Sequence, residues 1–157
     1  MKKSDKKKPT DSENNDGGKE LVKIEGVFVA NSPEGNNPVV FLENEDKRLL
    51  PIHVGAAEAF SIHTALEQMP YPRPLTHDLL VSVLDRLDSK VGKVIIDDLN
   101  DGIFFARLIV KKNGEEFEFD TRPSDAVALA VRTDAPIFVS RKIMDDASVD
   151  RSDYKLE

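Results

Sequence analysis

The chain has no cysteine and no tryptophan, and its 157 residues include only two tyrosines. Without cysteine, the protein cannot have a disulfide framework, a thiolate metal site or a cysteine nucleophile. No apolar run approaches the roughly 18 residues that suggest a membrane span, and the first residues lack the apolar stretch of a signal peptide. We therefore expect a cytoplasmic protein that makes no contact with a membrane.

Positive charge is also scarce, since 22 Lys and Arg stand against 29 Asp and Glu and give a net charge of −7. This balance argues against broad attraction to a nucleic-acid backbone, so a nucleic-acid role requires a local basic patch or a bound metal. The aromatic residues are mostly Phe in predicted strands, which argues against a base-stacking platform. The sequence has no GxGxxG fingerprint, P-loop, HExxH motif or basic recognition helix.

Residues 1–20 contain one hydrophobic residue, Met1, among Lys, Asp, Asn, Ser and Gly. Such a segment cannot bury enough surface to offset the entropy lost on ordering. We predict a disordered, Lys-rich tail that keeps the protein soluble, in preference to an arm that contacts nucleic acid. Residues 151–157 are expected to fray, which leaves one domain over residues 21–150 with length enough for a proper core.

Strands and helices can be assigned along this domain from the spacing of its apolar residues. Asn113-Gly114 predicts a tight hairpin turn, and Thr76 is a natural N-cap for a helix that runs to Leu87. The expected strands cover residues 21–31, 38–43, 49–54, 91–99, 102–112, 115–121 and 137–139, and the expected helices cover 56–69, 77–87, 141–147 and the segment from Pro123 to Thr133.

The turn between a strand and a helix near residue 122 carries most of the chemistry. Phe117 and Phe119 fall on one face of the strand, with acidic residues on the other. Pro123 suits the first position of a helix, and every residue from Ala126 to Val131 is apolar, which predicts a buried helix. The polar residues gathered at this corner are Asp120, Arg122, Ser124 and Asp125.

A weak internal repeat pairs this corner with an earlier one. Aligned without gaps, residues 52–60 and 119–127 each show an apolar strand end, a corner and an acid at the start of an apolar helix, with Glu58 matched to Asp125. Two such corners can look alike by chance, but each also follows two strands joined by a short turn. We predict a single α+β domain, with duplication of a unit of three antiparallel strands and a buried helix.

Three segments also carry a family resemblance. LPIHVGAAEAFSI (Leu50–Ile62), RPLTHDLL (Arg73–Leu80) and DTRPSDAVALAVRTDAPIFV (Asp120–Val139), in this order and at these distances, resemble the bifunctional nuclease domain family of bacteria, archaea and plants. The resemblance covers roughly residues 21–150. It implies an α+β fold with a duplicated sheet-and-helix unit, a homo-oligomer, and cleavage of both DNA and RNA, but no catalytic mechanism. His53 departs from the family, in which many members have an aromatic residue there.

Asp120 and Asp125 are the candidate metal ligands. Asp120 closes a strand and Asp125 opens a helix, so both carboxylates can face one pocket and hold Mg²⁺ or Mn²⁺, which would activate water and offset phosphate charge. The alternative makes Asp125 a first-turn helix acid and Asp120 a partner of Arg122. Arg122 itself suits a pair of phosphate oxygens or a structural ion pair.

The segment Thr76-His77-Asp78 is the other candidate cluster. We predict that His77 acts as general acid or base in phosphodiester hydrolysis, with Asp78 beside it and Arg73 steadying the developing charge. The alternative makes His77 an exposed first-turn residue and Asp78 a partner of the helix dipole.

These residues favour a nuclease that hydrolyses RNA and DNA with little sequence preference, assisted by a divalent cation, Mg²⁺ or Mn²⁺, and assembled as a homo-oligomer, with a dimer favoured. Nucleic acid would then be its substrate. The competing hypothesis is a binding or regulatory module without catalysis, in which the helix N-termini at Pro123 and Thr76 form an anion pocket. A third hypothesis is a scaffold whose buried helices serve only to build an oligomer.

Overall fold

The computed structural model describes residues 18–153, and its first unit is a meander of three antiparallel strands followed by a helix. The strands are β1 (Lys19–Ser32), β2 (Gly35–Glu43) and β3 (Arg48–His53), and each pairs with the next along the chain. The helix α1 (Ala56–Leu66) begins directly after Gly55. This unit is the first copy of the predicted repeat.

The second unit repeats the same plan. β4 (Lys90–Asn100), β5 (Ile103–Lys112) and β6 (Glu115–Thr121) pair in antiparallel order, and α3 (Pro123–Thr133) follows. Asn113 and Gly114 join β5 to β6 with φ values of 52° and 77°, as a tight turn of this type requires. The predicted α+β fold with two three-strand units and their helices is therefore confirmed.

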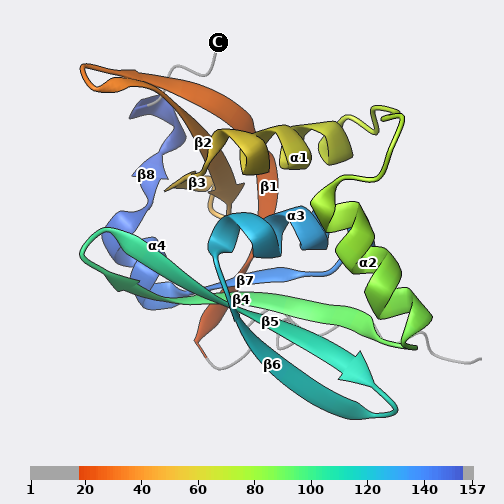
Figure 1. Ribbon diagram of the computed structural model, residues 1–157. Coiled ribbons are helices and arrows are strands. Elements are labelled where there is room, and N and C mark those ends of the chain that lie inside the picture. Colours follow the sequence, from red (N-terminus) through yellow and green to blue (C-terminus); the bar gives the residue numbers. More distant parts are fainter. Residues whose placement is uncertain (1–17, 154–157) are drawn as a thin grey trace, which may run out of the picture.

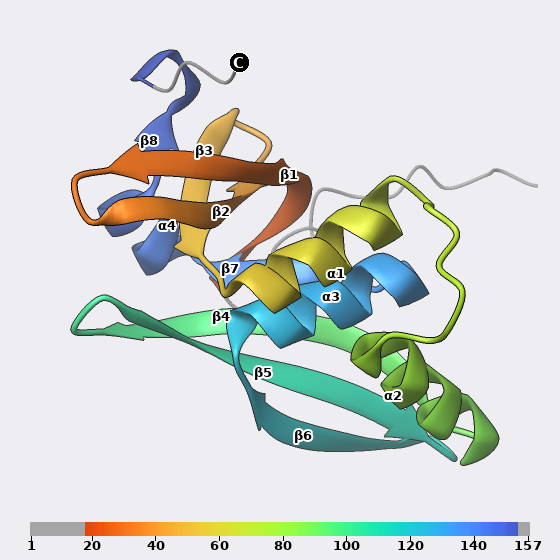
Figure 2. The same cartoon turned by 45° about the horizontal axis from the view of Figure 1, so that its top comes forward.

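Short elements connect the two units into one sheet. β7 (Ile137–Ser140) pairs antiparallel with β1 and parallel with β4, which gives the strand order β6-β5-β4-β7-β1-β2-β3-β8. α2 (Thr76–Arg86) lies between the units in sequence, and α4 (Arg141–Ala147), β8 (Val149–Asp150) and η2 (Arg151–Asp153) complete the chain. Figures 1 and 2 show α1 and α3 side by side, with β1–β3 and β4–β6 diverging from β7.

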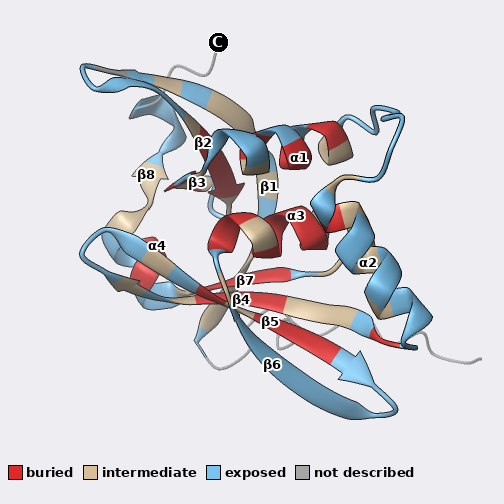
Figure 3. Ribbon diagram, in the orientation of Figure 1, coloured by how far each residue is buried: buried red, intermediate tan, exposed pale blue. Residues whose placement is uncertain are grey.

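One continuous core joins the two halves. Figure 3 shows α3 as the most buried helix and α2 as a largely exposed one. The apolar run from Ala126 to Ala130 is at most 3 % exposed, so the prediction of a buried helix is confirmed. The buried residues of α3 belong to the same core cluster as Ile62 of α1, Leu42 and Leu50 of the first unit, and Ile96 and Leu108 of the second.

Two helix boundaries differ from the prediction. α1 ends at Leu66 rather than at Met69, because Gln68 takes a left-handed backbone conformation with φ of 49°. Thr76 is the first residue of α2 rather than its cap, and Leu75 occupies the N-cap position without a side-chain hydrogen bond. None of the helices among residues 18–153 is long and apolar enough to cross a membrane.

The ends of the predicted domain also need correction. Strand β1 begins at Lys19, inside the segment predicted to be disordered, because Lys19 and Glu20 pair with β7. At the other end, Arg151–Asp153 forms a short 3₁₀ helix, held by ion pairs from Arg151 to Glu25 and Glu43. The rest of the two predicted disordered ends, residues 1–17 and 154–157, lies outside the described residues.

Candidate active site

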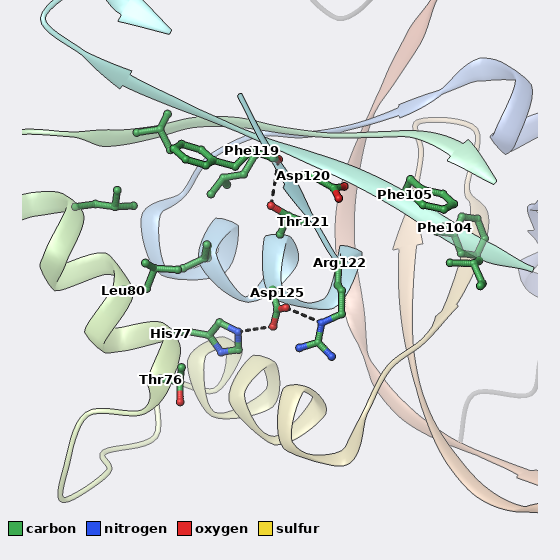
Figure 4. Close-up of a pocket in the computed structure, with 15 residues that line it drawn as sticks. Thr76, His77, Leu80, Phe104, Phe105, Phe119, Asp120, Thr121, Arg122 and Asp125 are labelled. Carbon is green, nitrogen blue, oxygen red and sulfur yellow. Dashed lines mark hydrogen bonds and ion pairs between the residues drawn. The ribbon is translucent and has the colours of Figure 1, made fainter. Parts of the chain in front are cut away.

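His77 is the buried centre of a polar cluster between α1, α2 and α3 (Figure 4). It stands in the first turn of α2, and its ring reaches both neighbouring helices. Nδ1 lies 2.6 Å from Oγ of Ser61 on α1, and Nε2 lies 2.9 Å from Oδ1 of Asp125 on α3. The alternative reading of His77 as an exposed residue is wrong, because these two partners hold the ring inside.

Asp125 determines which ring nitrogen of His77 carries the proton, and Arg132 supports the other side of the ring through Ser61. The side chain of Arg132 is only 8 % exposed, and its Nη2 donates a hydrogen bond of 2.9 Å to Oγ of Ser61. The ionised carboxylate of Asp125 can only accept a hydrogen bond, so Nδ1 of neutral His77 is the unprotonated nitrogen and accepts from the hydroxyl of Ser61. Neutral His77 then carries its proton on Nε2 and donates it to Asp125.

Arg122 links the two copies of the repeat. Its Nε donates to Oδ2 of Asp125 and its Nη2 to Oε1 of Glu58, both at 2.8 Å. Glu58 and Asp125 are the matched acids of the repeat, so the two corners lie next to each other. Arg122 remains 65 % exposed at its side chain, and the two carboxylates raise its pKa above the ordinary value.

The ionisation of Asp125 is set by opposing influences. Burial raises the pKa of its carboxyl, but the hydrogen bonds from Arg122 and His77 outweigh burial and hold the pKa below its usual value. Asp125 is therefore an anion at neutral pH. Its side chain is partly exposed, so it can contact a molecule bound beside the cluster.

The carboxylate of Asp78 accepts hydrogen bonds from Leu75 and Arg132 rather than from His77. Its Oδ2 accepts from the backbone N–H of Leu75 and its Oδ1 accepts from Nε of Arg132, each at 2.8 Å. The hydrogen bond from Arg132 is the main cause that lowers the pKa of Asp78. Asp78 thus anchors the start of α2, which is closer to the alternative proposed for it than to catalysis.

The structure places the two remaining candidates at the margin of the cluster. Arg73 is exposed in the connector between α1 and α2 and is not among the residues lining the cavities around His77. Asp120, at the end of β6, lines the same groove as Asp125. Both predictions for these residues, phosphate binding by Arg73 and cation binding by Asp120, stay predictions.

Asp120 and Asp125 alone do not complete the ligand set of a cation. Both carboxylate oxygens of Asp125 already accept hydrogen bonds, from His77 and Arg122. Within residues 18–153, no three His, Asp or Glu side chains are grouped closely enough to hold a metal ion. A cation bound by Asp120 and Asp125 would share the carboxylate of Asp125 with Arg122 and His77 and would take its other ligands from water or substrate oxygens.

Two cavities meet at the cluster. A groove of about 720 Å³ runs between α2, α3 and the β5–β6 hairpin and is mainly apolar, with Leu80 and Phe119 among its walls. A smaller hollow of about 360 Å³ lies at the first turns of α1, α2 and α3. His77, Arg122 and Asp125 line both, so a molecule in either cavity reaches the polar cluster.

Sequence reasoning missed Ser61 and Arg132. Ser61 sits between Ala59 and Ile62 on the apolar face of α1, and a polar residue at such a position was the one available signal. Arg132 ends the apolar run of α3, where a basic residue is ordinary. Glu58 was singled out only through the repeat.

The fold and the cluster define a class of protein: an α+β domain with a duplicated strand–helix unit and a His–carboxylate–Arg site between the copies. The family model of the bifunctional nuclease domain matches residues 39–152. The chain therefore belongs to the bifunctional nuclease domain family.

Individual relatives agree with this assignment. An uncharacterized protein of Mycobacterium tuberculosis (strain ATCC 25618 / H37Rv) is 38 % identical over 129 residues, which cover 82 % of this chain and 76 % of the relative. Bifunctional nuclease 1 of Oryza sativa subsp. japonica is 32 % identical over 108 residues, 67 % of this chain and 33 % of the relative. Bifunctional nuclease 1 of Arabidopsis thaliana is 30 % identical over 125 residues, which cover 72 % of this chain and 38 % of the relative.

Proposed function

We propose that this protein is a nuclease that hydrolyses phosphodiester bonds of RNA and DNA with little sequence preference. The observation that carries the proposal is the buried His77, hydrogen-bonded to Asp125 beside the exposed Arg122, at the junction of two cavities. Plant relatives that carry the name bifunctional nuclease support it.

In the proposed reaction, Arg122 binds the scissile phosphate. Its guanidinium has the planar fork of donors that matches a pair of phosphate oxygens, and such donors stabilise charge that develops in the transition state. Two of its nitrogens donate to Glu58 and Asp125. A bound phosphate would compete with these carboxylates for Arg122.

This competition would activate Asp125 as a base. The hydrogen bond from Arg122 is the strongest influence that lowers the pKa of Asp125, while burial raises it. When Arg122 turns to the phosphate, the pKa of Asp125 therefore rises, and the carboxylate accepts a proton from the attacking water more readily. His77 holds the carboxylate in place through its Nε2–H. As the water oxygen bonds to phosphorus, the bond from phosphorus to the leaving oxygen breaks, and that oxygen takes up a proton from solvent. Because water is the nucleophile, the reaction needs no ribose hydroxyl and serves RNA and DNA alike.

The direct test is cleavage of fluorogenic single-stranded RNA and DNA by wild type and by the Asp120→Asn/Asp125→Asn double variant, purified side by side. The paired preparation controls for host ribonuclease. Wild type should cut both substrates and the double variant should cut neither. Equal cleavage by the two preparations would refute the assignment of this corner.

The same assay with Mg²⁺, Mn²⁺ or EDTA decides the cation prediction separately. The steps described for Arg122, Asp125 and His77 use no metal, so cleavage should persist in EDTA. Loss of cleavage in EDTA, restored by Mn²⁺ or Mg²⁺, would show instead that the reaction requires a divalent cation, as expected if Asp120 and Asp125 bind one.

A second candidate function is an anion-binding module without catalysis. The first turns of α1, α2 and α3 all line the smaller hollow beside Arg122, and helix N-termini favour negative charge. A thermal-shift screen separates the two functions. A binding module should be stabilised by one anionic small molecule and should leave RNA and DNA intact.

We also propose that the protein acts in the cytoplasm as a homo-oligomer, with a dimer favoured. Leu79 and Val83 on α2 and Leu87 at its C-cap are large apolar side chains that are more than 40 % exposed, and their contact between subunits would remove apolar surface from water. Light scattering after size exclusion should give a dimer mass for wild type and a monomer mass for Leu79→Glu/Val83→Glu. A wild-type monomer would contradict the proposal.

A further inference from the structure

Two exposed aromatic rings next to the cluster have no role in the proposed reaction. Phe60 lies in α1, two residues after Glu58, and Tyr71 lies in the connector between α1 and α2. Their ring centroids are 5.6 Å apart with an interplanar angle of 73°, an edge-to-face pair. Phe60 is 46 % exposed and Tyr71 is 53 % exposed, so the pair keeps aromatic surface open to solvent.

Both rings line the smaller hollow together with Arg122 and Asp125. A phosphate held at Arg122 would therefore place its nucleotide in a hollow that offers aromatic surface on one side and the reacting groups on the other. Tyr71 stands between Pro70 and Pro72, whose rings fix the backbone φ angles. A ring on so stiff a connector loses little freedom when a ligand packs against it.

We propose that Phe60 and Tyr71 form a base-stacking subsite that selects single-stranded RNA and DNA over duplexes. The proposal rests on the proposed nuclease function, because it takes the phosphate to lie at Arg122. Unpaired bases present their faces to a protein, whereas bases in a duplex are stacked on one another. Every base has such a face, so stacking agrees with cleavage of little sequence preference.

Base stacking would also supply affinity for nucleic acid that a negatively charged chain lacks. At a net charge of −7, phosphate contacts alone supply little affinity for nucleic acid. Contact between bases and rings does not depend on charge. The sequence argued against such a platform because most of its aromatic residues are Phe in predicted strands. Phe60 and Tyr71 lie outside the strands, eleven positions apart, and the fold brings them together.

The chain offers a direct optical test of this contact. It has no tryptophan, and Tyr71 and Tyr154 are its only tyrosines. In the full-length Tyr154→Phe variant, all tyrosine fluorescence therefore comes from Tyr71. A single-stranded thymidine decamer should quench this fluorescence, whereas an abasic decamer with the same phosphates and a duplex of the same length should not.

Affinities of variants give the second readout, measured by anisotropy of the labelled decamer, with its integrity checked afterwards on a gel. Phe60→Leu and Tyr71→Leu should each weaken binding roughly tenfold, because each removes a ring and keeps an apolar side chain. Phe117→Leu is the matched control, since Phe117 is 43 % exposed on β6 and does not line the hollow. It should leave the affinity unchanged.

Each outcome decides the proposal. Equal quenching by the abasic decamer, unchanged affinity in both leucine variants, or absence of binding by wild type would overturn it. So would a wild-type oligomer that the two leucine variants convert to monomers, because the rings would then lie in a subunit contact. Stacking without cleavage would support the subsite and refute the nuclease reaction. Cleavage with an unchanged KM in the leucine variants would support the nuclease reaction and refute the subsite.

Discussion

The two strand–helix corners share a backbone plan and differ in the residues that point out of it. In the gapless alignment of the copies, Arg122 is matched by Gly55 and Arg132 is matched by Ala65. Each arginine of the second copy reaches a partner in the first, Arg122 at Glu58 and Arg132 at Ser61.

This difference explains why two similar corners give one site. Gly55 and Ala65 have no side-chain donor, so the first copy cannot make the reciprocal contacts with the second. In these two contacts the first copy supplies the acceptors and the second supplies the donors. His77 from α2 lies between the copies, next to Ser61 and Asp125. Substitutions at single positions of this arrangement test the part that each residue plays.

The largest effect is expected from Arg122→Met. This variant removes the proposed phosphate ligand, and loss of such a donor costs roughly 100- to 1000-fold in turnover. Arg141→Met is the matched control, because Arg141 is exposed in α4 and lines neither cavity. Turnover on fluorogenic RNA measures both. A similar loss of turnover in the two variants would show that Arg122 is not the phosphate ligand.

Arg132→Met should reduce stability by about 3 kcal/mol, because it leaves Asp78 and Ser61 without their buried partner. Urea unfolding at neutral pH measures the loss. Arg86→Met, at the exposed end of α2, serves as control and should change the free energy of unfolding by less than about 0.5 kcal/mol. Equal stability of the two variants would contradict the role given to Arg132.

Acid should destabilise the protein partly through Asp125. Its pKa is lower in the folded state than the unfolded value of about 4, so its stabilising contribution is present above that value. The contribution is lost as the pH falls below about 4 towards the folded pKa. Urea unfolding at pH 6 and pH 3 should therefore show a smaller drop for Asp125→Asn than for wild type. An equal drop in both proteins would refute the linkage.

The smallest effect is expected from Gly55→Ala. The backbone of Gly55 suits alanine, with φ of −69°, but an added Cβ would lie 2.2 Å from Oε2 of Glu58 and push that carboxylate aside. Stability should fall by about 1 kcal/mol or less, because the flexible end of Glu58 can move. In a Glu58→Ala background the same change should be neutral or slightly stabilising. Additive effects in this cycle, followed by urea unfolding, would show that the two residues do not interact.

The sequence predicted features that depend on neighbours along the chain. The apolar run Ala126–Val131 fixes a buried helix, and Asn113-Gly114 fixes a hairpin, because both follow from local conformation and burial. The structural ion pair expected for Arg122 forms with Asp125, three residues on, rather than with Asp120 as predicted. The repeat also anticipated that the two corners correspond.

The sequence did not predict the contacts between the helices. Ser61 contacts His77, 16 positions later in the sequence, and Arg132, 71 positions later. Both contacts depend on how α1, α2 and α3 pack. No local pattern encodes a crossing of three helices. The edge-to-face pair of Phe60 and Tyr71 escaped notice for the same reason, since one ring lies in a helix and the other in a connector.

The central claim is that the second copy carries the reacting carboxylate, and one comparison tests it most directly. Asp125→Asn and Glu58→Gln change matched acids, and both should be assayed for turnover of single-stranded RNA beside wild type. Asp125→Asn should lose at least about 100-fold, as expected for a general base, whereas Glu58→Gln, which contacts only Arg122 in the cluster, should retain most of the activity. Equal losses in the two variants, or wild-type turnover by Asp125→Asn, would contradict the account.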